Sequence, residues 1–223
     1  MHIEPGVVDG AKMMFSYGTA AAAAGYTVKL MADDLRTHAV PSFAVRTVLA
    51  SALIFLCFEV LPHFAVGVSE VHFILGTTAL LMFGAGAGAL GLVAALALQG
   101  LVFAPTDLPM FTVNVTTLLF PLFAIHALAA RIIPADKPYV DLSYNEVLKL
   151  SLAYQGGIVA WVAFWAIYGQ GFGVMSDVMA FGAAYMLVVL IEPVADLAIL
   201  AGVKGLRTAG EKGIFARRLH HAA

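Results

Sequence analysis

Seven long apolar runs fill most of this 223-residue chain, and short polar segments separate them. Most of the runs approach ~20 residues, the length at which an α-helix crosses a hydrocarbon core about 30 Å thick. Hydrophobic residues make up 61% of the sequence and charged residues 12%, whereas soluble proteins average about 45–50% and about 25%. The sequence therefore predicts an integral membrane protein in which residues 1–223 form a single transmembrane domain.

The order and length of these runs predict an all-α, polytopic membrane fold with about seven transmembrane helices. The third run is short, and only a glycine-rich break at residues 84–88 separates it from the fourth, so a six-span arrangement remains open. The expected helices cover residues 11–32, 44–62, 70–84, 87–104, 113–131, 147–168 and 175–202.

The distribution of basic residues indicates the orientation, because cytoplasmic segments of membrane proteins are enriched in Lys and Arg. With the N-terminus outside, 11 of the 12 basic residues fall in inner segments and only Lys12 remains outside. We therefore expect an outside N-terminus, an inside C-terminus and a basic cytoplasmic tail at residues 204–223. This orientation places His2, His63 and His72 at the outer side and His38, His220 and His221 at the inner side, with His126 inside the fifth span.

The second residue is a histidine, which places an imidazole beside the α-amino group of Met1. Initiator methionine is normally removed only before a small residue, so we expect Met1 to stay. The terminal amine, the backbone nitrogen of His2 and its Nδ1 atom would then form a planar chelate suited to Ni(II), Cu(II) or Co(II). Residues 1–10 are a candidate metal-binding segment; the alternative is a solvated tail.

His72 is the residue that would supply the missing fourth nitrogen. It is expected at the start of the third span, on the same side of the membrane as His2, at a depth that an inward-folded N-terminal segment could reach. A histidine at a helix start is more often simply hydrogen-bonded. Asn114 begins the fifth span on this side, where it would either hold a loop or a ligand in place or cap the helix.

Two carboxylates lie one turn apart in the last span, at Glu192 and Asp196. Charged groups in a membrane are costly and usually have a specific partner. Because the inner basic tail follows about a turn later, we expect Lys or Arg residues of the inner side to pair with them.

Three short motifs resemble the CbiM/NikM family of substrate-binding membrane components of cobalt and nickel transporters. The first is Met-His-Ile followed by a short acidic, glycine-containing segment, at Met1 to Gly6. The second, a turn, a histidine and then a glycine-containing helix, matches Ser69 to Gly76. The third, Asn114 to Thr117 followed by Pro121, is an asparagine with threonines ahead of an apolar helix. The resemblance covers about residues 1–125 and, more weakly, the rest of the chain.

The resemblance implies that Met1, His2 and His72 bind one Co(II) or Ni(II) ion, the transported substrate, from the outer side. It implies that the chain is not an enzyme and works with a transmembrane coupling (T) subunit and cytoplasmic ATPases of an energy-coupling-factor (ECF) transporter, in a bacterial cytoplasmic (inner) membrane. The chain has no phosphate-binding Walker motif and no feature that suggests a nucleic-acid partner. Ser69 and Glu70 belong to the loop that orients His72, and Glu70 and Val71 replace serines that the family usually carries.

Two other functions remain open from the sequence. One is a haem-binding or other redox membrane subunit that uses His72 and His126, with His63 as a further candidate ligand. The other is a non-transporting accessory subunit of a larger membrane complex. The choice between cobalt and nickel also stays open, because the same nitrogen ligands serve both ions.

Overall fold

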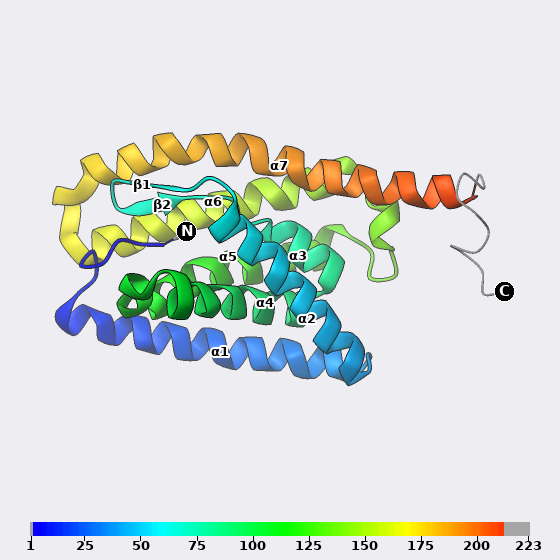
Figure 1. The fold of residues 1–223 in the computed structure, drawn as a ribbon, viewed down its shortest axis with the longest axis horizontal. Coiled ribbons are helices and arrows are strands. Elements are labelled where there is room, and N and C mark those ends of the chain that lie inside the picture. Colours follow the sequence, from blue (N-terminus) through cyan, green and yellow to red (C-terminus); the bar gives the residue numbers. More distant parts are fainter. Residues whose placement is uncertain (1, 212–223) are drawn as a thin grey trace.

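The computed structural model describes residues 2–211 as a helical bundle with a small hairpin at one end (Figure 1). The predicted all-α, polytopic membrane fold is confirmed. The α-helices are α1 (Met13–Leu35), α2 (Val40–Phe55), α3 (Gly76–Phe83), α4 (Ala85–Leu98), α5 (Phe111–Ile132), α6 (Tyr144–Gln170) and α7 (Met175–Glu211). The strands are β1 (Phe64–Val66) and β2 (Ser69–Val71).

Four stretches of the described residues are long and apolar enough to cross a membrane. The last of them contains both α6 and α7. They are Val40–Val60, Ala85–Phe103, Pro105–Ile132 and Tyr144–Thr208. Large apolar side chains on these helices point away from the protein, including Leu190 and Val194 on α7, as expected of a surface that lipid covers.

Short irregular turns extend several of the helices toward the hairpin. A π-helical turn, η2 (Leu56–Val60), continues α2, and a second, η3 (Gln99–Phe103), continues α4. A 3₁₀ turn, η4 (Pro105–Met110), then leads into α5. Such π-helical turns often occur at functional sites, because they rotate the side chains that follow them out of the regular helical positions.

The prediction of a transmembrane helix over residues 70–84 is wrong for the first half of that range, which is not helical. Its helix, α3, has only eight residues, about 12 Å at 1.5 Å per residue, which is too short to cross a bilayer. The residues before it form β2 and an extended segment instead. The predicted break between the third and fourth helices is present, because Gly84 has a φ of 90° that ends α3 and starts α4.

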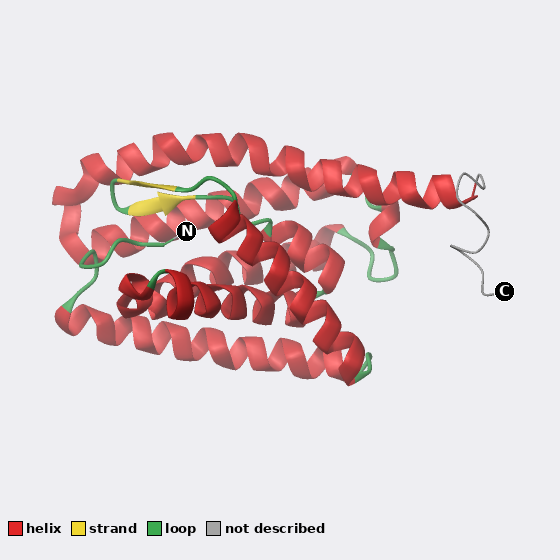
Figure 2. Ribbon diagram, in the orientation of Figure 1, coloured by secondary structure: helices red, strands yellow, loops and turns green. Residues whose placement is uncertain are grey.

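The hairpin occupies the part of the bundle that α3 does not reach. Figure 1 shows β1 and β2 at the end of the molecule where α1 begins, with α3 toward the other end. Figure 2 shows the two strands alongside α7, which contacts both of them. The strands pair antiparallel, with Ala65 opposite Glu70. This places the short stretch from Glu70 to His72 inside the bundle at the start of α3.

Candidate metal centre

The N-terminal segment pairs with the hairpin through a single β-bridge. Ile3 forms an antiparallel bridge with Ser69. On either side of this bridge the backbone N–H of Glu70 donates to the carbonyl of His2 at 2.8 Å, and that of Glu4 donates to Val68 at 3.1 Å. The chain is therefore buried at its second and third residues, as expected of an N-terminal segment that folds inward.

Two residues that the sequence analysis singled out form hydrogen bonds with this N-terminal segment. The hydroxyl of Ser69 donates to the carbonyl of His2 at 2.9 Å, and the backbone N–H of Ile3 donates to Oδ1 of Asn114 at 2.8 Å. Asn114 is the fourth residue of α5 and is buried. Its side chain therefore contacts the N-terminal segment, and the N-cap of α5 is Met110.

His2 and His72 face one another at the end of the hairpin. Their ring centroids are 5.3 Å apart, and both residues are almost fully buried, with 3% and 1% of their surfaces exposed. Phe58, on the π-helical turn η2, packs edge-on against both rings at 5.7 Å and 4.7 Å. Nothing in the sequence indicated Phe58, because its position depends on the π-turn.

Glu70 is the third polar group of this cluster. Its Oε2 lies 2.9 Å from Nδ1 of His2. The hydrogen bond from His2 lowers the pKa of the Glu70 carboxyl, and burial lowers the pKa of His2 to about 4. The pair therefore consists of a neutral imidazole that donates through Nδ1 and a carboxylate that accepts.

The two imidazoles present basic nitrogens to the interior. Nδ1 of His72 donates to the carbonyl of Phe73 at 2.9 Å, and a neutral imidazole that donates through Nδ1 carries its lone pair on Nε2. Nε2 of His2 is buried and has no hydrogen-bond partner among the described residues. One ligand atom from each of His2, Glu70 and His72 lies within 4.8 Å of the other two. Such a set suits a transition-metal cation.

The predicted ligand Met1 lies outside the described residues, as do His220, His221 and most of the predicted basic tail. His2 is the first described residue. The other predicted histidines are elsewhere. His63 is exposed and its Nδ1 contacts the carbonyl of Leu61.

The buried carboxylate of Glu192 binds the segment that follows His72. The sequence predicts a different partner for this carboxylate. Glu192 on α7 accepts hydrogen bonds from the backbone N–H groups of Ile74 and Leu75, each at 2.8 Å, and from the side chain of Gln155. Contrary to expectation, no Lys or Arg among the described residues pairs with Glu192. Backbone amides at the start of α3 take that place, because this half-helix leaves its first N–H groups unpaired inside the protein.

Within residues 2–211, Asp196 likewise has hydroxyl and amide partners and no cation. It accepts hydrogen bonds from Thr78 and from the hydroxyl of Ser151, the latter at 2.7 Å. The hydroxyl of Tyr185 donates to Gln155, which extends the same buried network. These polar contacts join α3, α6 and α7 to the segment that follows His72.

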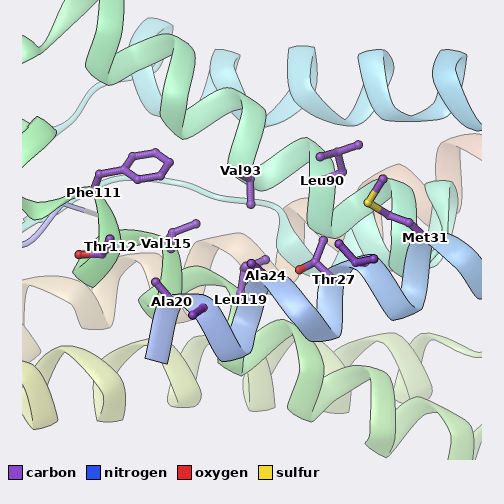
Figure 3. A pocket seen from close by; sticks show the side chains of 12 residues that line it. Ala20, Ala24, Thr27, Met31, Leu90, Val93, Phe111, Thr112, Val115 and Leu119 are labelled. Atoms are coloured by element: carbon purple, nitrogen blue, oxygen red, sulfur yellow. The ribbon is translucent and has the colours of Figure 1, made fainter. Parts of the chain in front are cut away.

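A larger hollow elsewhere in the bundle has a different character. It measures about 390 Å³ and lies between α1, α4 and α5 (Figure 3). Its walls are alanines, aliphatic side chains and Phe111, with Thr27 and Thr112 as the polar exceptions. It holds no pair of groups suited to binding a cation, so the imidazole and carboxylate cluster is the candidate metal centre.

Comparison with known proteins identifies the family. The sequence profile described as the cobalt uptake substrate-specific transmembrane region, CbiM, matches residues 2–209. The chain belongs to the CbiM family. This confirms the resemblance found in the three motifs, and it makes the protein a membrane component of metal uptake.

Two crystal structures share the fold of this CbiM family member. One, described as a transition metal transporter, has a TM-score of 0.72 over 99% of this chain and 100% of that chain. The other, a truncated transition metal transporter, has a TM-score of 0.70 over 91% and 98%. Each is 16% identical in sequence. No curated protein sequence matches the chain significantly.

Proposed function

We propose that the protein is the substrate-binding component of an ECF transporter and captures Co(II) or Ni(II) from the outer side of a bacterial cytoplasmic membrane. The ligands would be the amine of Met1, the backbone nitrogen and imidazole of His2, and the imidazole of His72. A transmembrane coupling subunit and cytoplasmic ATPases would supply the energy for release. The chain itself would catalyse no reaction.

The observation that carries the proposal is the pairing of the chain start with the hairpin. This pairing brings His2 and His72, which are 70 positions apart in the sequence, to a ring separation of 5.3 Å in a buried site. Imidazole nitrogens are preferred ligands of these ions. The distribution of basic residues along the sequence supports the outer location, because cytoplasmic segments are enriched in Lys and Arg.

Blocking the terminal amine tests the proposal directly. Untagged protein should bind Co(II) or Ni(II) in isothermal titration, whereas a form with a short glycine–serine extension before Met1 should not, because its amine is moved away from His2. The extension should exceed one residue, since a single added residue would leave an amine, two amides and the imidazole free to form a different chelate. The same extension at the C-terminus is the matched control.

Substitution of the imidazoles provides the second arm. His72→Ala should abolish or strongly weaken binding, and His126→Ala should not. If the N-terminally extended form binds either metal with unchanged affinity, the terminal chelate is wrong. Uptake of the metal by cells that also produce the coupling subunit and ATPases would separate a transporter from a non-transporting accessory subunit.

The haem alternative gains no support from the geometry. His126 lines a pocket with Lys29, Asp34 and Arg46, whereas His72 faces His2. Axial haem ligands must face one another from opposite sides of one ring system. Purified protein should therefore show no Soret absorption band.

A further inference from the structure

We propose that Glu70 is itself a ligand of the transported ion, so that the site combines nitrogen and oxygen donors. This inference rests on the proposed function and concerns the same site. The motif resemblance assigned Glu70 only to the loop that orients His72. The register of the strands, the atomic contact with His2 and the charge of the site each point to the more direct role.

The strand register places Glu70 on the metal side of the hairpin. Because Ile3 is bridged to Ser69 in an antiparallel pair, His2 lies directly opposite Glu70. Side chains two apart in an extended segment point to the same face, so Glu70 and His72 share a face. The ligand atoms of the three side chains accordingly lie within 4.8 Å of one another.

The contact between Glu70 and His2 involves the atom that the chelate needs. Oε2 of Glu70 lies 2.9 Å from Nδ1 of His2, and the chelate with the terminal amine and the backbone nitrogen uses this same Nδ1. A metal ion bound to an imidazole nitrogen lies ~2.0–2.1 Å from it. An ion that replaces the shared proton would thus arrive beside the carboxylate oxygen.

The charge of a buried site favours a bound carboxylate. A divalent cation that binds a deprotonated backbone nitrogen keeps one positive charge, which is costly to bury without a counter-ion. Glu70 carries the opposite charge, and among residues 2–211 its carboxylate contacts the neutral imidazole of His2 and forms no ion pair with a lysine or arginine. The carboxylate can therefore neutralise the complex, and no other cation has to be displaced.

An oxygen donor changes which ion the site prefers. Four nitrogens in a plane are typical of Ni(II) and Cu(II) sites, while added carboxylate or water ligands suit ions that take more than four donors. We therefore expect the ratio of the Co(II) affinity to the Ni(II) affinity to be higher in this protein than in a site with the four nitrogens alone. Glu70 would be the residue that determines this preference.

Glu70→Gln tests the inference, because it keeps the size and a hydrogen-bond acceptor but removes the charged ligand. Glu4→Gln is the matched control, since Glu4 is a neighbouring carboxylate whose charge interacts with Glu70 but which lies outside the cluster of ligand atoms. The affinities for Co(II) and Ni(II) would be measured by titration of untagged protein. The magnetic moment of the nickel-bound form reports whether Ni(II) is planar.

The wild type and Glu4→Gln should bind Ni(II) in a paramagnetic form, as expected for more than four donors. Glu70→Gln should shift nickel toward the diamagnetic, planar form and weaken Co(II) binding about tenfold or more, with a smaller effect on Ni(II). If Glu70→Gln matches the wild type in magnetic moment and metal preference, Glu70 is not a ligand, although the proposed function stands. If the untagged wild type binds neither metal, both proposals fail.

Discussion

Glu192 on α7 accepts a hydrogen bond from the backbone N–H of Leu75 at 2.8 Å, and Leu75 has a left-handed conformation with φ of 56°. A residue with a branched side chain adopts this conformation at a cost of about 1–2 kcal/mol. The buried carboxylate offsets that cost by pairing both Leu75 and the preceding Ile74. Glu192 thus fixes the segment that begins at His72, three residues before Leu75.

Glu192→Ala should destabilise the protein and weaken metal binding together. The change leaves the amides of Ile74 and Leu75 and the side chain of Gln155 without their acceptor, at about 1–3 kcal/mol for each buried group. Thermal unfolding and metal titration would measure the two effects. Glu192→Gln, which keeps an acceptor oxygen, should lose less stability and less metal affinity than Glu192→Ala. Leu190→Ala, on the exposed face of the same helix, should leave metal affinity unchanged, and equal losses in both alanine variants would contradict this role.

The sequence was sufficient to predict the membrane class and the family, and it singled out His2 and His72, whose rings lie 5.3 Å apart in the structure. Long apolar runs and a motif at the very start of the chain are local signals, and they need no knowledge of distant contacts. The strand at residues 69–71 was missed because a short apolar run has the same composition in a strand as in a buried helix. Its pairing partner, Ile3, lies 66 positions earlier in the chain.

The partner of Glu192 was mispredicted for a related reason. The basic residues nearest in sequence suggested an ion pair, but the deciding fact is that α3 starts inside the protein with unpaired N–H groups. That depends on the length of α3, which hydropathy did not reveal. The sequence did not predict the role of Phe58, because its contact with the imidazoles depends on a π-helical turn rather than on a regular helix.

Gly169→Ala should loosen the N-terminal segment. A Cβ atom at Gly169 on α6 would collide with the backbone carbonyl of Val7, so the segment that carries His2 would have to move. We expect metal affinity to fall at least about tenfold, as is common when residues that position ligands are disturbed. Limited proteolysis near the N-terminus would report the displacement itself.

The same helix provides the control for this substitution. A Cβ atom at Gly156 would meet nothing within 4 Å, so Gly156→Ala should leave metal binding intact and add up to ~1 kcal/mol of helix stability. If Gly169→Ala binds metal as tightly as Gly156→Ala does, the contact with Val7 is not needed to hold the segment.

Asn114 offers a test of the clamp on Ile3. Asn114→Leu removes the acceptor for the buried N–H of Ile3 and should weaken metal binding by about 10- to 100-fold. Asn114→Asp retains an oxygen at the same position and should bind metal more tightly than the leucine variant. Titration of both variants, with circular dichroism to check the helical fold, decides the matter. If Asn114→Leu binds metal as tightly as Asn114→Asp or more tightly, the hydrogen bond to Ile3 is not needed to hold the N-terminal segment.

The metal-free protein should lose stability as the pH falls from about 6.5 toward 4. Burial lowers the pKa of His2 to about 4, whereas an unfolded histidine takes up its proton near pH 6.5. Between these values the unfolded chain binds more protons than the folded one, so the free energy of unfolding decreases with decreasing pH. The groups that face the ring are His72 and Glu70, with the charge of His63 nearby.

The contribution of His2 is the difference between the wild type and His2→Gln, whose second residue is still too large for removal of Met1. Thermal unfolding of both proteins at pH 7 and at pH 5, without metal, should show a steeper loss in the wild type. The difference should approach at most about 1.4 kcal/mol per pH unit, the value for one proton. Parallel pH profiles would mean that His2 is accessible to protons in the folded state, and so that the N-terminal segment does not stay docked against β2 in the absence of metal.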